Sequence, residues 1–118
     1  MRAKDAVGRY GENVATRFVQ DAGWQVLDRN WRGADGELDI VALDGTALVT
    51  VEVKTRRGVG FGHPAEAVTA RKVARLRRLT AQWVAAHDVR PRSIRIDVIA
   101  VLVPRSGAAH VEHLVGIV

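Results

Sequence analysis

Two carboxylates and one lysine are the residues of this chain whose types and spacing could most directly do chemistry. Asp39 stands in one alternating segment, and Glu52 and Lys54 stand two residues apart in the next. Residues two apart on a strand point the same way, so Glu52 and Lys54 share a face. Carboxylate oxygens suit hard cations such as Mg²⁺ and Mn²⁺. A lysine beside such a cation can hold a water nucleophile or offset charge on a phosphoryl oxygen.

A β-hairpin is expected to position these three side chains. Strands are predicted at residues 37–43 and 46–55, and Asp44-Gly45 between them is a strong turn signal. A two-residue loop there pairs Leu43 with Thr46, so odd positions of the first strand share a face with even positions of the second.

This register gives the hairpin two different faces. It pairs Asp39 with Thr50 and makes Glu52 a diagonal neighbour of Asp39, within roughly 7–8 Å between backbones. Two carboxylates that converge in this way repel each other unless a cation or a proton joins them. The opposite face is wholly apolar and holds Leu38, Ile40, Ala42, Val49, Val51 and Val53.

The remaining elements predict an α/β fold with the order α-β-β-β-α-β-β. With 118 residues the chain is expected to be one domain, in which the helices cover both faces of a mixed sheet. Besides the hairpin we expect a helix at 5–22, strands at 24–31, 93–103 and 110–118, a Gly-rich loop at 56–64 and a helix from the N-cap Thr69 to about His87.

The first predicted helix carries an acidic residue beside its apolar stripe. Gly8 and Gly11 lie on or beside that stripe, so the helix is expected to approach a neighbour closely, and Glu12 lies at its edge. The sequence supports a role for Glu12 at the site and an exposed position without such a role about equally. The stripe consists of Val7, Tyr10, Val14, Ala15, Phe18 and Ala22.

Charge is distributed unevenly along the chain. The net charge is +5, but residues 1–53 sum to −3 and residues 54–95 sum to +9. The basic block suggests a polyanionic partner. The acidic block needs its own explanation, because carboxylates repel phosphate unless a cation lies between them.

Other features exclude several classes of protein. The chain has no cysteine, which excludes a disulfide scaffold, a thiolate zinc site and a cysteine nucleophile. No stretch approaches the roughly 18 apolar residues of a membrane span, and no signal-peptide core is present, so we expect a cytoplasmic protein with no membrane partner.

Several strings around the candidate residues resemble a nuclease signature. Asp39 followed by Glu52-x-Lys54 resembles the PD-(D/E)xK pattern, although no proline precedes Asp39. A longer ordered set, spanning about residues 8–103, resembles the YraN-type family of predicted endonucleases. Its strings are Gly11-Glu12, Asn30-Trp31-Arg32, Gly36-Glu37-Leu38-Asp39-Ile40-Val41-Ala42, Val51-Glu52-Val53-Lys54-Thr55-Arg56 and Arg95-Ile96-Asp97-Val98.

The resemblance implies a restriction-endonuclease-like core, similar to that of Holliday junction resolvases. It implies that Asp39 and Glu52 hold Mg²⁺ or Mn²⁺, with the Val53 carbonyl as a further ligand. It also implies that Lys54 positions or activates the attacking water, and that Glu12 binds metal through water or a second ion.

Alternatives stay open for two charged residues near this site. Glu37 shares the face of Asp39, yet contact with Arg32 or the loop is the preferred interpretation. A lysine beside an apolar stripe usually snorkels, but from the first turn of the second helix Lys72 could reach the site.

Arginines of the basic block recur on one side of the second helix and open the Gly-rich loop. A solvated face is as good an interpretation as phosphate contact, which would be sequence-independent and salt-sensitive. The predicted nucleic-acid-binding residues are Arg56, Arg57, Arg71, Lys72, Arg75 and Arg78.

Other polar residues are expected to be structural. Asp97 lies in an apolar strand and needs a partner such as Arg95 or a backbone amide, with a site role as the secondary alternative. The four histidines form no metal-ligand spacing with the carboxylates, and His63 in the loop is the least certain of them.

Two functions compete at this point. The leading hypothesis is a metal-dependent nuclease that hydrolyses DNA phosphodiester bonds, with branched or recombination intermediates as candidate substrates. The alternative is a non-catalytic nucleic-acid-binding accessory module on the same fold. A homodimer through the last strand is expected only by fold analogy.

Overall fold

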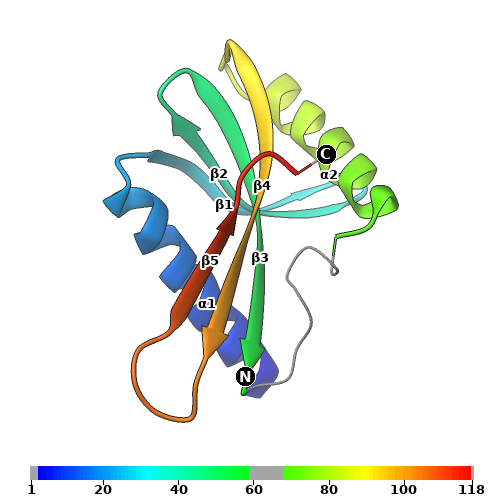
Figure 1. The fold of residues 1–118 in the computed structure, drawn as a ribbon. Helices are drawn as coiled ribbons and strands as arrows, with labels where there is room; N and C mark the ends of the chain where they lie inside the picture. The colour runs from blue at the N-terminus through cyan, green and yellow to red at the C-terminus, as the bar shows by residue number, and fades with distance from the viewer. Residues whose placement is uncertain (1–2, 59–67, 118) are drawn as a thin grey trace.

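A mixed sheet with a helix on each face forms the structure, a computed structural model that describes residues 3–58 and 68–117 (Figure 1). The element order α-β-β-β-α-β-β confirms the prediction. The elements are α1 (Ala3–Asp21), β1 (Gln25–Gly33), β2 (Gly36–Asp44), β3 (Ala47–Arg57), α2 (Ala70–Ala86), β4 (Ser93–Val103) and β5 (His110–Leu114).

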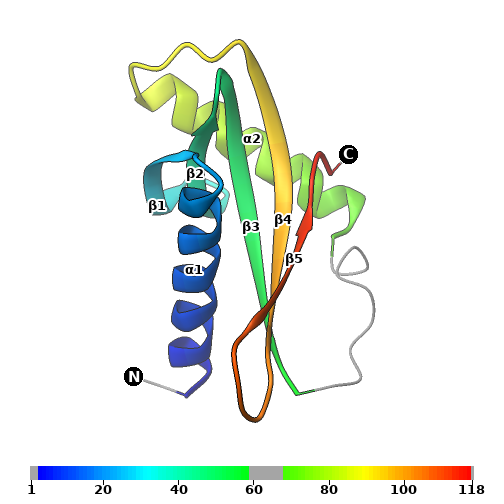
Figure 2. The ribbon, with the colours of Figure 1, turned by 60° about the vertical axis from the view of Figure 1, so that its left-hand side comes forward.

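The strands follow chain order across the sheet, β1-β2-β3-β4-β5. Neighbours are antiparallel except β3 and β4, which are parallel because α2 carries the chain back across the sheet between them. Figure 2 shows β3 and β4 extending beyond β2, with α1 alongside them.

Each helix packs on its own hydrophobic cluster. Alternate residues of β3 and β4 point to opposite faces, which is why one sheet supplies both clusters. The cluster under α1 holds Ala15, Val19, Ile40, Ala42, Val49, Val51, Ile99 and Val101. The cluster under α2 holds Leu38, Val41, Leu48, Leu76, Leu79, Trp83 and Ile96.

Within its paired residues, 40–44 and 47–51, the β2–β3 hairpin has the predicted faces but not the predicted register. Asp44 pairs with Ala47, so the turn is Gly45-Thr46 and the pairing of Leu43 with Thr46 is wrong by two residues. Gly45 has φ 62°, and a glycine with positive φ at the first central position is the feature of type II′ turns. A shift of two residues leaves every side chain on its face.

The ladder between β2 and β3 ends at the pair Ile40–Val51. Asp39 and Glu52 are therefore the first residues beyond it, at the point where the strands separate, and Asp39 does not pair with Thr50. The β1–β2 turn continues toward α2, where the backbone N–H of Ala34 donates to Gln82 Oε1 at 3.1 Å.

The same divergence corrects the expected face of Leu38. This side chain joins the cluster under α2 instead of lying beside Ile40, because the start of β2 curls onto α2. Gly36, at the first position of β2, lies within reach of Leu79 of that helix.

The buried face of α1 also differs from the predicted stripe. Ala15 and Val19 are fully buried, whereas Tyr10 is 46% exposed and Phe18 is 37% exposed. Gly11 lies on the buried face, and a Cβ there would meet the Thr55 side chain of β3, which confirms a close approach at this glycine. The close approach places the neighbouring Glu12 against the open end of the hairpin.

The ends of two predicted strands change. β3 includes Arg56 and Arg57, which were expected in the loop at 56–64, while residues 59–64 of that loop, with His63, lie outside the described residues. β5 ends at Leu114 and not at residue 118, and Gly116 follows with φ 67°. Thr69 caps α2 as predicted. Within the described ranges, no helix is both long and apolar enough to cross a bilayer.

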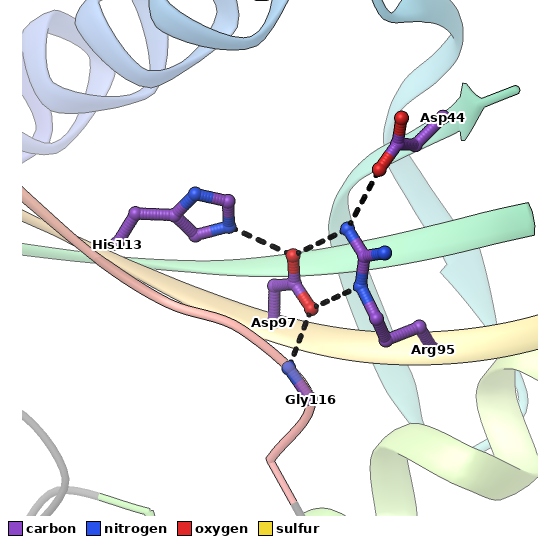
Figure 3. A network of polar contacts seen from close by, with 5 residues as sticks. All are labelled: Asp44, Arg95, Asp97, His113 and Gly116. Atoms are coloured by element: carbon purple, nitrogen blue, oxygen red, sulfur yellow. Dashed lines mark hydrogen bonds and ion pairs between the residues drawn. The ribbon is translucent and has the colours of Figure 1, made fainter.

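Asp97, fully buried on β4, has the partners expected for it and more (Figure 3). It accepts hydrogen bonds from Arg95 at 2.9 and 3.1 Å and from the Gly116 backbone N–H at 2.9 Å. His113 Nε2 lies 2.7 Å from its Oδ2, and Arg95 also reaches Asp44 at 3.2 Å. This network ties the end of the chain to the sheet.

Candidate functional site

An open pocket of about 650 Å³ lies where β2 leaves β3. The exposed edge of β3 forms its floor, and α1 and the start of β2 bound it because Gly11 lets the helix approach closely. Its charged lining residues are Glu12 of α1, Asp39 of β2, and Glu52, Lys54, Arg56 and Arg57 of β3. With Val53, seven of the residues predicted from the sequence to act at a site thus line one cavity.

Three carboxylates converge beside this pocket, and two of them, Glu12 and Asp39, line it. One oxygen each from Glu12, Glu37 and Asp39 lies within 4.8 Å of the other two, and all three residues are half-buried. Glu37 also contacts Arg32 at 3.4 Å, which confirms the contact that the sequence favoured for it. Glu37 belongs to the carboxylate cluster as well. The chemistry of this donor set fits a hard divalent cation such as Mg²⁺ or Mn²⁺.

Asp39 is the carboxylate under the greatest electrostatic strain. Burial, followed by the neighbouring charge of Glu52, raises the pKa of Asp39 to about 7. Glu12 and Glu37 add to the increase, and a hydrogen bond of 2.9 Å from the Val53 backbone N–H to Asp39 Oδ2 opposes it. A cation at the cluster would relieve the same repulsion that here favours a proton.

Glu52 is bound by two lysines instead. Lys72 Nζ lies 3.3 Å and Lys54 Nζ 3.6 Å from the same oxygen, Glu52 Oε1. Lys72 therefore reaches the site from α2. The sequence had favoured a lysine that snorkels to solvent over this position. Burial, followed by a hydrogen bond with Lys72, lowers the pKa of Lys54, so Lys54 releases a proton more readily than a solvated lysine.

Glu12 is held in the pocket by α1 and β1 together. Burial raises its pKa, and a hydrogen bond with the Asn30 side chain partly opposes the increase. Asn30 has φ 52°, a left-handed conformation that asparagine tolerates better than most residues. This backbone geometry is one reason why β1 can present Asn30 to the helix.

The predicted phosphate-binding arginines of α2 are exposed. Arg71 and Arg75 lie on the outer face of the helix, and Arg78 on that face is 3.4 Å from Asp35 in the β1–β2 turn. α2 carries five basic residues and no acidic one. A strongly positive helix thus borders the site, whereas Arg56 and Arg57 line the pocket itself.

The chain matches known proteins over most of its length. Residues 11–101 match the model of "Uncharacterised protein family UPF0102". The chain belongs to this family. A UPF0102 protein of Beutenbergia cavernae is 62% identical over 117 residues, 99% of each chain. UPF0102 proteins of Kineococcus radiotolerans and Streptomyces coelicolor are 58% and 53% identical over 99% of this chain and 97% and 92% of theirs.

Two residues of this UPF0102 chain contact the site more closely than the sequence predicted. A role for Glu37 was the less favoured alternative, and Asn30 had no predicted role. Glu37 joins the carboxylate cluster, and its position on the face of Asp39 was the signal for that. Asn30 contacts Glu12 from a left-handed position of β1, a property that no spacing indicates.

Proposed function

We propose that this UPF0102 protein is a metal-dependent nuclease that hydrolyses phosphodiester bonds in DNA. The observation that supports this most strongly is that Glu12, Asp39, Glu52 and Lys54 line one open pocket, with Glu37 clustered beside Glu12 and Asp39. Carboxylates that can hold a metal ion, next to a lysine that can position water, are able to support an in-line attack of water on a phosphodiester.

The cation-binding residues of the proposed enzyme are Asp39, Glu12 and Glu37. Glu52 is a further carboxylate that lines the same pocket. When bound, Mg²⁺ or Mn²⁺ supplies positive charge for the phosphoryl oxygens and a template for the attacking water. The Val53 carbonyl remains a proposed ligand, next to the N–H that fixes Asp39.

Lys54 is the residue proposed to handle the attacking water. Its lowered pKa allows it to accept a proton from water as the new oxygen–phosphorus bond forms and the bond to the leaving oxygen breaks. Lys54 Nζ lies at the pocket, 3.6 Å from Glu52 Oε1.

The basic face of α2 and the two arginines at the end of β3 are proposed to hold the nucleic-acid backbone. Such contacts carry no sequence information, so they suit a substrate recognised by shape, such as a branched DNA, better than a base sequence. Affinity should fall steeply as salt rises, because the phosphate contacts release counterions.

The deciding experiment incubates the protein with four-way junction, flap, single-stranded and duplex DNA in Mg²⁺ or Mn²⁺. Cleavage by the wild type should fall at least about a hundredfold in Asp39→Ala, Glu52→Ala and Lys54→Ala. Asp21→Ala is the matched control, because this exposed carboxylate pairs only with Arg17 among the contacts found for the described residues.

A non-catalytic binding module is the second candidate. The positive charge of α2 supports it, because the exposed Arg71, Arg75 and Arg78 could bind nucleic acid whether or not the pocket is active. Salt-sensitive binding without cleavage of any of the four substrates would favour this module and exclude the nuclease.

A further inference from the structure

A lysine of α2 lies at the pocket without lining it. Lys72 Nζ is 3.3 Å from Glu52 Oε1, and the Lys72 side chain is only 17% exposed. A snorkelling lysine would extend its ammonium group to water. Lys72 instead directs its charge inward, to a glutamate whose side chain is itself 12% exposed.

The position of Lys72 does not favour the stability of α2. The N-terminal end of a helix is positive and prefers acidic side chains, yet the first turn of α2 contains Arg71 and Lys72 and no acidic residue. Thr69 Oγ1 accepts from the backbone N–H of Lys72 at 3.2 Å and so caps this end. The helix therefore starts where Lys72 can reach β3, despite the unfavourable charge.

Two ammonium groups share one oxygen of Glu52. Lys72 lies 3.3 Å and Lys54 3.6 Å from Oε1, so either lysine alone could neutralise the carboxylate. Only Lys54 lines the pocket. A lysine that is fully engaged by Glu52 is less available to a phosphodiester, so the second lysine changes what the first can do.

We propose that Lys72 is a positioning residue: it supplies the counter-charge of Glu52 and thereby leaves Lys54 free to face the phosphodiester. This role rests on the proposed nuclease function. It also has a consequence without DNA, because the positive charge of Lys72 opposes the binding of a divalent cation at the neighbouring carboxylates.

The test removes the charge of Lys72 and keeps its stem. Lys72→Met should lower kcat for DNA cleavage about tenfold to a hundredfold and leave KM within about twofold, because the buried ammonium group does not contact solvent-facing phosphates. It should also bind Mn²⁺ about threefold to tenfold more tightly in calorimetric titrations without DNA. Lys72→Arg, which keeps the charge, should restore both values toward those of the wild type.

Arg77→Met is the matched control, because it removes one charge from the same helix on the side facing Ile94 and Ile96 of β4. It should change neither kcat nor Mn²⁺ affinity. Thermal unfolding of each variant excludes a folding defect, and Lys72→Gln replaces Lys72→Met if the latter does not fold.

The outcomes separate the two proposals. A wild type that cuts, with Lys72→Met unchanged in kcat and Mn²⁺ affinity, would overturn the role of Lys72 alone. A wild type that cuts no substrate would exclude the nuclease, and the Mn²⁺ titration would then decide: tighter binding by Lys72→Met supports the electrostatic part of the role, and equal binding overturns it.

Discussion

Asp97 on β4 and Asp39 on β2 are carboxylates of one sheet in opposite surroundings. Asp97 accepts hydrogen bonds from Arg95 and Gly116 and lies against His113, and these contacts outweigh burial and lower its pKa. Asp39 receives a hydrogen bond from the Val53 N–H, and its acidic neighbours add to burial in raising its pKa to about 7.

The difference distinguishes a structural polar cluster from one arranged for a ligand. A buried carboxylate that only stabilises the fold is surrounded by donors, as Asp97 is in Figure 3. Asp39 instead lies among other carboxylates, those of Glu12, Glu37 and Glu52. Three of these four residues, Glu12, Asp39 and Glu52, line an open pocket. Such an arrangement lowers stability unless a cation or proton is bound, which makes it a functional-site candidate.

The largest effect on stability is expected from Asp97→Ala. This change leaves the Arg95 guanidinium without its closest partner and frees the Gly116 amide, and breaking a buried charged network costs about 3 kcal/mol of the free energy of unfolding. Urea denaturation measures the loss. Asp21→Ala, in an exposed pair with Arg17, should stay within about 0.5 kcal/mol of the wild type. A loss as small for Asp97→Ala would contradict a structural network.

The pH dependence of stability should have opposite signs at the two carboxylates. The folded-state pKa of Asp39, about 7, lies above the ordinary value of 3.8, so its contribution to stability is present below pH 3.8 and is lost as pH rises through 7. The pKa of Asp97 is lowered, so its contribution is present above pH 3.8 and is lost as pH falls through its folded-state pKa.

Asp39→Asn isolates the first of these two effects. In EDTA, the wild type should lose about 2 kcal/mol relative to Asp39→Asn between pH 4.5 and pH 8, measured by denaturation at each pH. Mn²⁺ should restore stability at pH 8 in the wild type and much less in the variant. Parallel curves for the two proteins would show that Asp39 titrates normally and that the contrast with Asp97 is wrong.

A single methyl group at Gly11 should move α1, which bounds the pocket, away from β3. A Cβ at Gly11 would clash with the Thr55 side chain, so Gly11→Ala forces α1 away from β3 and should cost about 1.5 kcal/mol. Gly8→Ala adds the same group where no atom of the described residues lies within 4 Å, and it should stabilise the helix by about 0.5 kcal/mol. Thermal unfolding compares them, and equal effects would remove the role given to Gly11.

The sequence predicted the faces of the sheet better than its register. Apolar alternation in β2 and β3 sets which side chains share a face, and a slip of two residues preserves that pattern. Asp39 and Glu52 were therefore expected on one side, although the turn moved from Asp44-Gly45 to Gly45-Thr46. The geometry of the turn decides which of two such registers the hairpin adopts, and the apolar alternation alone does not distinguish them.

Features that depend on tertiary packing could not be predicted in the same way. Apolar residues cover so much of α1 that they do not show which of them face the sheet, and Tyr10 and Phe18 are the ones left exposed. The contact of Lys72 with Glu52 depends on where α2 crosses the sheet, and the contact of Asn30 with Glu12 depends on one left-handed residue. These are relations between distant segments, which local spacing does not encode.

The smallest effect is expected from an ion pair that is neither buried nor crowded. Arg78 and Asp35 lie 3.4 Å apart, and their side chains are 57% and 43% exposed. Solvent screens such a pair, so a double-mutant cycle with Arg78→Ala and Asp35→Ala should give a coupling of at most about 0.5 kcal/mol, reduced further by salt. A coupling above 1 kcal/mol would mean that two opposite charges stabilise the fold strongly whenever they are close, even when both are exposed. The contrast between Asp97 and Asp39 would then not depend on burial and the supply of donors.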